Sequence, residues 1–173
     1  MKRILSAICC VALCSIPALA QKKAAGGPAM SDQQFVDFAA QTDMVEANLG
    51  QLAETVGSSQ AVKDYGQMLA MDHTNDYHQL YDAAHQASLN VPDAIDKEHN
   101  KMLIDPLQKL KGAAFDRRFA QEMIAGHTKA IAVYKKEAAD AQNPGIKAYA
   151  QAALPTLQKH LDGAKNLEKA KTK

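Results

Sequence analysis

The chain has 173 residues, 47% of them hydrophobic, and its 20 Lys and Arg side chains nearly balance 19 Asp and Glu side chains. The formal net charge of +1 argues against a nucleic-acid-binding protein, which usually carries a clustered basic excess. The apolar content excludes an intrinsically disordered chain, and the length fits one domain with a short additional segment.

The first 20 residues have the three parts of a secretory signal peptide. Residues 1–3 form a basic start, residues 4–16 are almost wholly apolar, and Ala18 and Ala20 supply small residues before a cleavage point. The apolar part is too short for a membrane-spanning helix, which needs about 20 residues. We therefore expect residues 1–20 to be removed, a periplasmic location and no membrane span in the mature chain.

Cleavage after Ala20 changes the chemistry available to the chain. It removes two basic residues and all three cysteines, so that 18 basic side chains remain against 19 acidic ones. A chain without a thiol has no disulfide, thiolate metal site or cysteine nucleophile. Histidine and methionine are then its only soft-to-borderline metal ligands.

The mature chain begins with a polar stretch and continues as a series of amphipathic helices. Residues 21–30 have no apolar periodicity, which predicts a flexible tail. From Ser31 on, apolar residues recur at spacings of three and four, which is typical of helices with one buried face. The pattern predicts four long helices over residues 31–57, 58–88, 112–141 and 143–170, and a shorter connecting helix over 93–111.

Local signals mark the ends of these helices. Ser31 with Gln34 fits a capping box. Gly57 ends the first helix, and Pro106 is expected to kink or restart the connecting helix. Pro155 is expected to bend the last helix, because it leaves the carbonyl of Gln151 without its helical donor.

The loop lengths predict how the helices pair. The loops at 57–59 and 141–145 are short, so each joins two antiparallel neighbours. The segment between the two hairpins is long enough to run most of the length of a bundle. We predict an all-α fold, a ferritin-like four-helix bundle over residues 31–170 with a long, partly helical crossover between the second and third helices.

Each long helix carries one ionisable residue on or beside its apolar stripe, near the middle of the helix. These residues are Glu46, His73, His127 and His160. Two interpretations stay open. The four could bind one transition-metal ion, zinc, iron, copper or manganese, because imidazole and carboxylate from facing helices suit such ions. They could instead form a buried hydrogen-bond network, in which Glu46 pairs with a protonated histidine and fixes the helix register.

The remaining polar residues point to supporting or solvent-facing roles. At 100° per residue, His78 and His85 are predicted to face solvent, and Asp72 to point away from the apolar stripe of its helix. Asp76 and Asp116 share the stripes but lie at other levels, so we expect them to support or cap. The core stripes carry no serine for a Ser-His-Asp site, and the chain has no glycine-rich phosphate loop, so there is no complete catalytic motif.

Several short motifs together resemble a known bacterial family. They are, in chain order, Asp72-His73-Thr74, Phe115-Asp116, His127, Leu154-Pro155 and His160-Leu161. With the signal peptide, they are similar to the exported family called domain of unknown function 4142, related to the ferritin-like superfamily, over about residues 31–170. The resemblance implies a ferritin-like bundle in the bacterial envelope and no established activity. Members are often labelled predicted outer-membrane proteins, a label that no feature of this sequence supports.

The sequence departs from catalytic ferritins. Di-iron sites take a Glu from each of two helices and a Glu-x-x-His motif from each of the other two. Here Glu122 and Glu137 have no histidine three residues later, so the ligand set is incomplete and di-iron oxidase chemistry is not expected. The two predicted functions are a single-metal site and a non-enzymatic envelope interaction or stress-related module. We expect a homo-oligomer or an envelope protein as partner.

Overall fold

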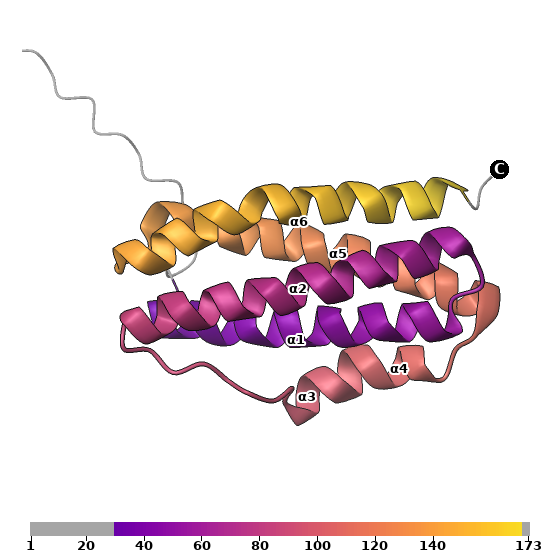
Figure 1. The fold of residues 1–173 in the computed structure, drawn as a ribbon, viewed down its shortest axis with the longest axis horizontal. Helices are drawn as coiled ribbons and strands as arrows, with labels where there is room; N and C mark the ends of the chain where they lie inside the picture. The colour runs from indigo at the N-terminus through magenta and orange to yellow at the C-terminus, as the bar shows by residue number, and fades with distance from the viewer. Residues whose placement is uncertain (1–29, 171–173) are drawn as a thin grey trace, which may run out of the picture.

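The computed structural model describes residues 30–170, and this part of the chain is almost wholly helical (Figure 1). The predicted signal peptide and nearly all of the predicted tail lie outside the described residues. The four long helices are α1 (Asp32–Val56), α2 (Gln60–Gln86), α5 (Gly112–Asp140) and α6 (Pro144–Ala170). The crossover contains α3 (Lys97–His99), a π-helical turn η1 (Asn100–Ile104) and α4 (Asp105–Gln108).

The helices pair as the loop lengths predict. α1 packs against α2 and α5 packs against α6, and the two hairpins meet mainly through α2 and α6. The crossover runs back along α1 to the opposite end of the bundle, so α5 is parallel to α2 (Figure 1). The predicted all-α four-helix bundle with a long crossover is confirmed. Over residues 30–170 no strand occurs and no helix is long and apolar enough to cross a membrane.

Polar side chains close the helix ends. Ser31 accepts from the backbone N–H of Gln34, and the Gln34 side chain accepts in return from the backbone N–H of Ser31, which confirms the capping box. Asn143 accepts from the N–H groups of Gly145 and Ile146 at the start of α6. These caps supply partners to N–H groups that a helix leaves free at its first turn.

The crossover is tied to α1 by a buried amide. Gln41 donates to the carbonyl of Ala94 at 2.9 Å and accepts from the N–H of Asp96 at 3.0 Å. The helical backbone runs from the π-helical turn through Ile104 and Asp105 without a break, so the predicted restart at Pro106 is not seen. Pro106 instead stands in the first turn of α4. Its missing N–H is least costly there.

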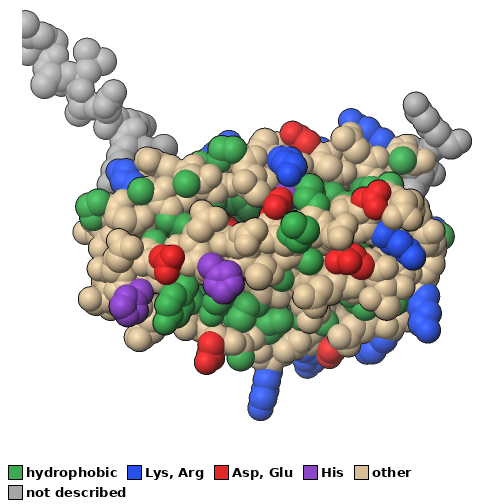
Figure 2. All heavy atoms as spheres, viewed as in Figure 1, with side chains coloured by type: hydrophobic (Ala, Val, Ile, Leu, Met, Phe, Trp, Pro, Cys, Tyr) green, Lys and Arg blue, Asp and Glu red, His purple; other side chains and the backbone are tan. Residues whose placement is uncertain are grey.

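The interior consists of two apolar cores with a polar layer between them. One core lies at the end of the bundle that holds Phe35, Tyr134 and Ile146, and the other holds Leu69 and Phe119. The buried polar side chains of the middle of the bundle occupy the layer between the cores: Asp43, Glu46, His73, His127 and His160. On the outer face shown in Figure 2, acidic and basic side chains are interspersed.

Candidate metal centre

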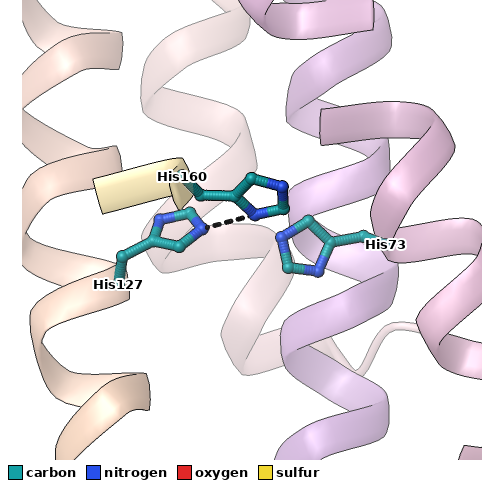
Figure 3. Close-up of side chains that lie close together, drawn as sticks. All are labelled: His73, His127 and His160. Atoms are coloured by element: carbon teal, nitrogen blue, oxygen red, sulfur yellow. Dashed lines mark hydrogen bonds between the residues drawn. The ribbon is translucent and has the colours of Figure 1, made fainter. Parts of the chain in front are cut away.

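Three imidazole rings from three helices meet in the polar layer. They are His73 of α2, His127 of α5 and His160 of α6, each at most 2% exposed. One nitrogen from each ring lies within 4.8 Å of the other two, and the rings face one another (Figure 3). The shortest of these separations joins Nε2 of His127 to Nδ1 of His160 at 3.3 Å. Three of the four residues predicted from the sequence therefore come together.

A backbone carbonyl sets the tautomer of His127. Its Nδ1 lies 2.9 Å from the carbonyl oxygen of Met123, one helical turn earlier on α5. A carbonyl oxygen only accepts, so Nδ1 carries the hydrogen and donates. In the neutral ring, Nε2 then carries a lone pair, which points at His160.

Asp72 sets the tautomer of His160. Its Oδ2 lies 2.9 Å from Nε2 of His160, across the boundary between α2 and α6. The carboxylate accepts, so Nε2 donates and Nδ1 keeps a lone pair toward the other rings. The prediction that Asp72 points away from the site is therefore wrong. The side chain leaves α2 at the edge of its buried face, 29% exposed, and from there it reaches the neighbouring helix.

Asp43 sets the tautomer of His73. Its Oδ1 lies 2.9 Å from Nδ1 of His73, and the side chains are 1% and 2% exposed. Nε2 of His73 is buried and has no hydrogen-bond partner among the described residues. Sequence reasoning missed Asp43, although a signal existed. Ala39, Asp43, Glu46 and Gly50 recur at spacings of three and four, and all four are buried.

When all three rings are neutral, the arrangement directs three lone pairs at one another. Lone pairs repel unless a cation lies between them. Metal-binding histidines usually donate their second N–H to a carboxylate or a backbone carbonyl, as all three rings do here. An ion with bonds of about 2.0–2.1 Å to nitrogen in tetrahedral geometry separates two ligand nitrogens by about 3.3–3.4 Å. The 3.3 Å between His127 and His160 fits that geometry.

Burial keeps two of the rings neutral. It lowers the pKa of His127 to about 4, helped by the charge of His73 and only partly opposed by the Met123 carbonyl. Burial likewise lowers the pKa of His160 to about 4, against the opposing effect of Asp72. At neutral pH both rings are in the form that binds metals.

His73 and Asp43 behave as a coupled pair. Burial opposes the charged form of His73, but the hydrogen bond and charge of Asp43, with the charges of Glu46 and Asp76, outweigh it and raise its pKa. Burial raises the pKa of Asp43 to about 7, although His73 pulls it down. Nδ1 of His73 carries the hydrogen bonded to Asp43, and the raised pKa favours a second proton on Nε2, which a metal ion would have to displace.

Glu46, the fourth predicted residue, lies on the other side of His127. Its Oε1 is 3.9 Å from Nδ1 of His127, the nitrogen that faces away from the cluster. Its Oε2 is buried and has no hydrogen-bond partner among the described residues. The structure therefore brings the three histidines together and does not place Glu46 in that group.

The other polar residues have supporting or outer positions. Asp76 accepts from the hydroxyl of Tyr149 at 2.7 Å, and Asp116 accepts from both the N–H and the hydroxyl of Ser58 in the α1–α2 loop. Both carboxylates join neighbouring elements of the bundle and lie outside the three-histidine cluster, and their supporting or capping roles stay predictions. The two histidines expected to face solvent, His78 and His85, are both exposed.

The comparisons with known proteins bear on the fold. A family model described as "Domain of unknown function (DUF4142)" matches residues 17–167. Among solved structures, CopM in its Cu(II)-bound form is 16% identical, with a TM-score of 0.68 over 83% of this chain and 99% of that chain. CopM in its Cu(I)-bound form is 15% identical, with a TM-score of 0.68 over 82% and 97%.

A third similar structure is CopM in its Ag-bound form, obtained by co-crystallization. It is 15% identical, with a TM-score of 0.66 over 82% of this chain and 97% of that chain. At these identities the likeness shows a shared fold. None of the curated proteins matches the sequence.

Proposed function

This chain belongs to the DUF4142 family, and from that premise and the geometry of its buried layer we propose that it binds one transition-metal ion through His73, His127 and His160. One observation carries the proposal. Each ring donates one N–H to a fixed acceptor and turns its other nitrogen toward the other two rings. A buried metal ion is the partner that such a donor set fits.

The donor set narrows the choice of ion. The sequence allowed zinc, iron, copper or manganese, and three imidazoles without a carboxylate in the cluster suit copper or zinc better than manganese. Copper is the ion to test first, because the CopM structures that share the fold hold copper or silver. Glu46 as a further ligand stays a prediction, since its carboxylate would have to move around His127.

The chain's own residues would hold and shield the ion. Asp43, Asp72 and the Met123 carbonyl orient the rings, and the apolar cores on either side exclude water. A narrow cavity between α2 and α6 is lined by Asp72, His73 and His160 and gives an acidic approach to the cluster. Together with the predicted signal peptide, this supports a periplasmic protein that takes up and holds a metal ion.

The test is metal content. The mature chain is incubated with Cu(II), Cu(I) or Zn(II), freed of unbound ions by gel filtration, and analysed for metal per chain. We expect one ion per chain, lost in His160→Ala and kept in His85→Ala, which removes an exposed histidine. Failure to retain any of the three ions, or equal metal in the two variants, would contradict the proposal.

The alternative is a structural hydrogen-bond network. It is supported by the same contacts, because a protonated His73 held by Asp43 would direct its second N–H at the lone pairs of His127 and His160. In that case His160→Ala would lower the stability of metal-free protein and no ion would raise the stability of the wild type. A homo-oligomer or an envelope protein partner stays a prediction.

A further inference from the structure

A cavity of about 250 Å³ lies between α1, the crossover and α5, on the side of His127 that faces away from the three-histidine cluster. Its volume is well above the roughly 10–15 Å³ that one water molecule needs. Most of its wall is apolar. The main apolar side chains in the wall are Phe38, Val45, Leu49, Leu103 and Met123.

A buried carboxylate lines this apolar cavity. Glu46 is 6% exposed, and its Oε2 has no hydrogen-bond partner among the described residues. A buried polar atom without a partner is costly, and a charged one more so. Gly126 leaves room for the carboxylate, since a Cβ at that position would lie 3.0 Å from Oε1 of Glu46. A carboxylate with an unsatisfied oxygen therefore lines the cavity.

The other charged groups at the wall are of both signs, so Glu46 is the carboxylate there without a cationic partner among the described residues. Glu122 is a second, half-buried carboxylate there and forms an ion pair with Arg118. Lys129 also borders the cavity, and its ammonium group lies 5.5 Å from the centre of the Phe38 ring, a favourable position for a cation over an aromatic face. His99 borders the cavity from the crossover and pairs with Asp96.

We propose that this cavity binds a small organic amine, with its protonated amino group donating to the Glu46 carboxylate and a short apolar body packed against the wall. An ammonium group has three donors and a charge opposite to that of the carboxylate. An apolar body displaces water from the aliphatic and aromatic lining. Small-molecule sites commonly combine a mostly apolar wall with a few fixed polar groups.

The site is separate from the proposed metal centre. The ring of His127 turns Nε2 to the cluster and Nδ1 to the Met123 carbonyl and Glu46, so it stands between the two sites. Amine binding therefore does not rest on metal binding. The experiments can therefore contradict metal binding without contradicting amine binding, and the reverse.

The experiment compares two probes of equal length, n-hexylamine and 1-hexanol, by calorimetric titration of the metal-free mature chain at pH 8. A chelator is present, so that the amine has no metal to bind. We expect hexylamine to bind at least tenfold more tightly than hexanol. In Glu46→Gln this preference is expected to disappear while hexanol binding stays within threefold, which also shows that the cavity is intact.

Two further measurements locate the site and control for charge. Glu122→Gln removes a carboxylate from the same wall and is expected to change hexylamine affinity by less than threefold. Amide chemical shifts of Gly126 and Val45 are expected to move on titration with hexylamine. These shifts locate the hexylamine site even if the Glu46→Gln variant does not fold. The proposal would be overturned if hexylamine did not bind at millimolar concentration or bound no more tightly than hexanol. It would also be overturned if the preference survived in Glu46→Gln, or if the shifts were confined to other parts of the chain.

Discussion

The groups on the outer nitrogens decide what each histidine can do. His127 donates from Nδ1 to a backbone carbonyl, which can only accept a hydrogen bond. Its inner nitrogen, Nε2, is therefore an acceptor at neutral pH. His160 and His73 donate to carboxylates, which also make the rings more basic toward a metal. The partners of the three rings, and not only their positions, therefore suit them to the proposed role as ligands.

Removing one such partner should weaken metal binding while the ligands remain. In Asp72→Ala, His160 loses the acceptor that orients it, and the affinity for copper is expected to fall about tenfold. Asp72 is partly exposed, so the variant should fold. The affinity is measured by competition with a chromophoric chelator. Asp82→Ala, which removes an exposed carboxylate from the same helix, is the control, and equal affinities in the two variants would argue against this role of Asp72.

At the level of elements, the approach of α1 to α2 brings Asp43 to His73. The two backbones come close at Gly50 and Gly66, where a Cβ on Gly66 would lie 2.6 Å from the carbonyl oxygen of Gly50 and 2.7 Å from Cβ of Ala53. Neither neighbour is the flexible end of a side chain. Glycine is therefore required for packing at this crossing, about two turns from the histidine layer.

A methyl group at this crossing should force the helices apart. Gly66→Ala gains about 1 kcal/mol of helix propensity. Overpacking costs typically about 1–3 kcal/mol, and more where backbone must move. We expect a net loss of about 1–2 kcal/mol in the free energy of unfolding, measured with urea. Gln67→Ala, at an exposed neighbouring position, should stay within about 0.5 kcal/mol of the wild type. A Gly66→Ala protein as stable as that control would show that α1 and α2 can separate at little cost.

At the scale of the whole molecule, one end of the bundle is closed by carboxylates from different helices. Asp32, in the first turn of α1, accepts from the N–H groups of Gln142 and Asn143 in the α5–α6 loop. Glu137 of α5 is buried at the same end, 3% exposed, and its Oε1 has no hydrogen-bond partner among the described residues. Burial, followed by the charge of Asp32, raises the pKa of Glu137 from 4.5 to about 7.

This shift makes the stability of the fold depend on pH. The pKa is higher in the folded state, so between about pH 4.5 and 7 the folded chain holds a proton that the unfolded chain releases. Stability therefore falls as the pH rises through this range. Glu137→Gln should lessen the fall, to which the raised pKa of Asp43 also contributes, and be more stable than the wild type by about 1–2 kcal/mol at pH 8, because one unit of pKa corresponds to about 1.4 kcal/mol.

The measurement is urea unfolding of both proteins at pH 5 and pH 8. Glu54→Gln, an exposed residue of α1, gives the same change in net charge and should leave the pH dependence of the wild type unchanged. A Glu137→Gln protein with the full pH dependence of the wild type would show that another group is responsible.

Much of the fold could be predicted from the sequence because helical periodicity, caps and loop lengths are local properties. The capping box at Ser31 and the placement of His73, His127 and His160 on buried faces follow from neighbours within a few residues. The loop lengths also sufficed to predict the long crossover. These features depend on the chain near each residue and need no knowledge of the opposing helix.

Only the tertiary structure decided how the site is connected. A helical projection gives an angle around one axis, but it gives neither the offset between two helices nor the reach of a side chain at the edge of an interface. For that reason Asp43 was missed, Asp72 was assigned the wrong direction, and Glu46 came to lie behind His127 and not beside the other two rings. The sequence alone determined that three histidines are buried at one level. The packing of four helices determined which nitrogen of each ring is free to bind.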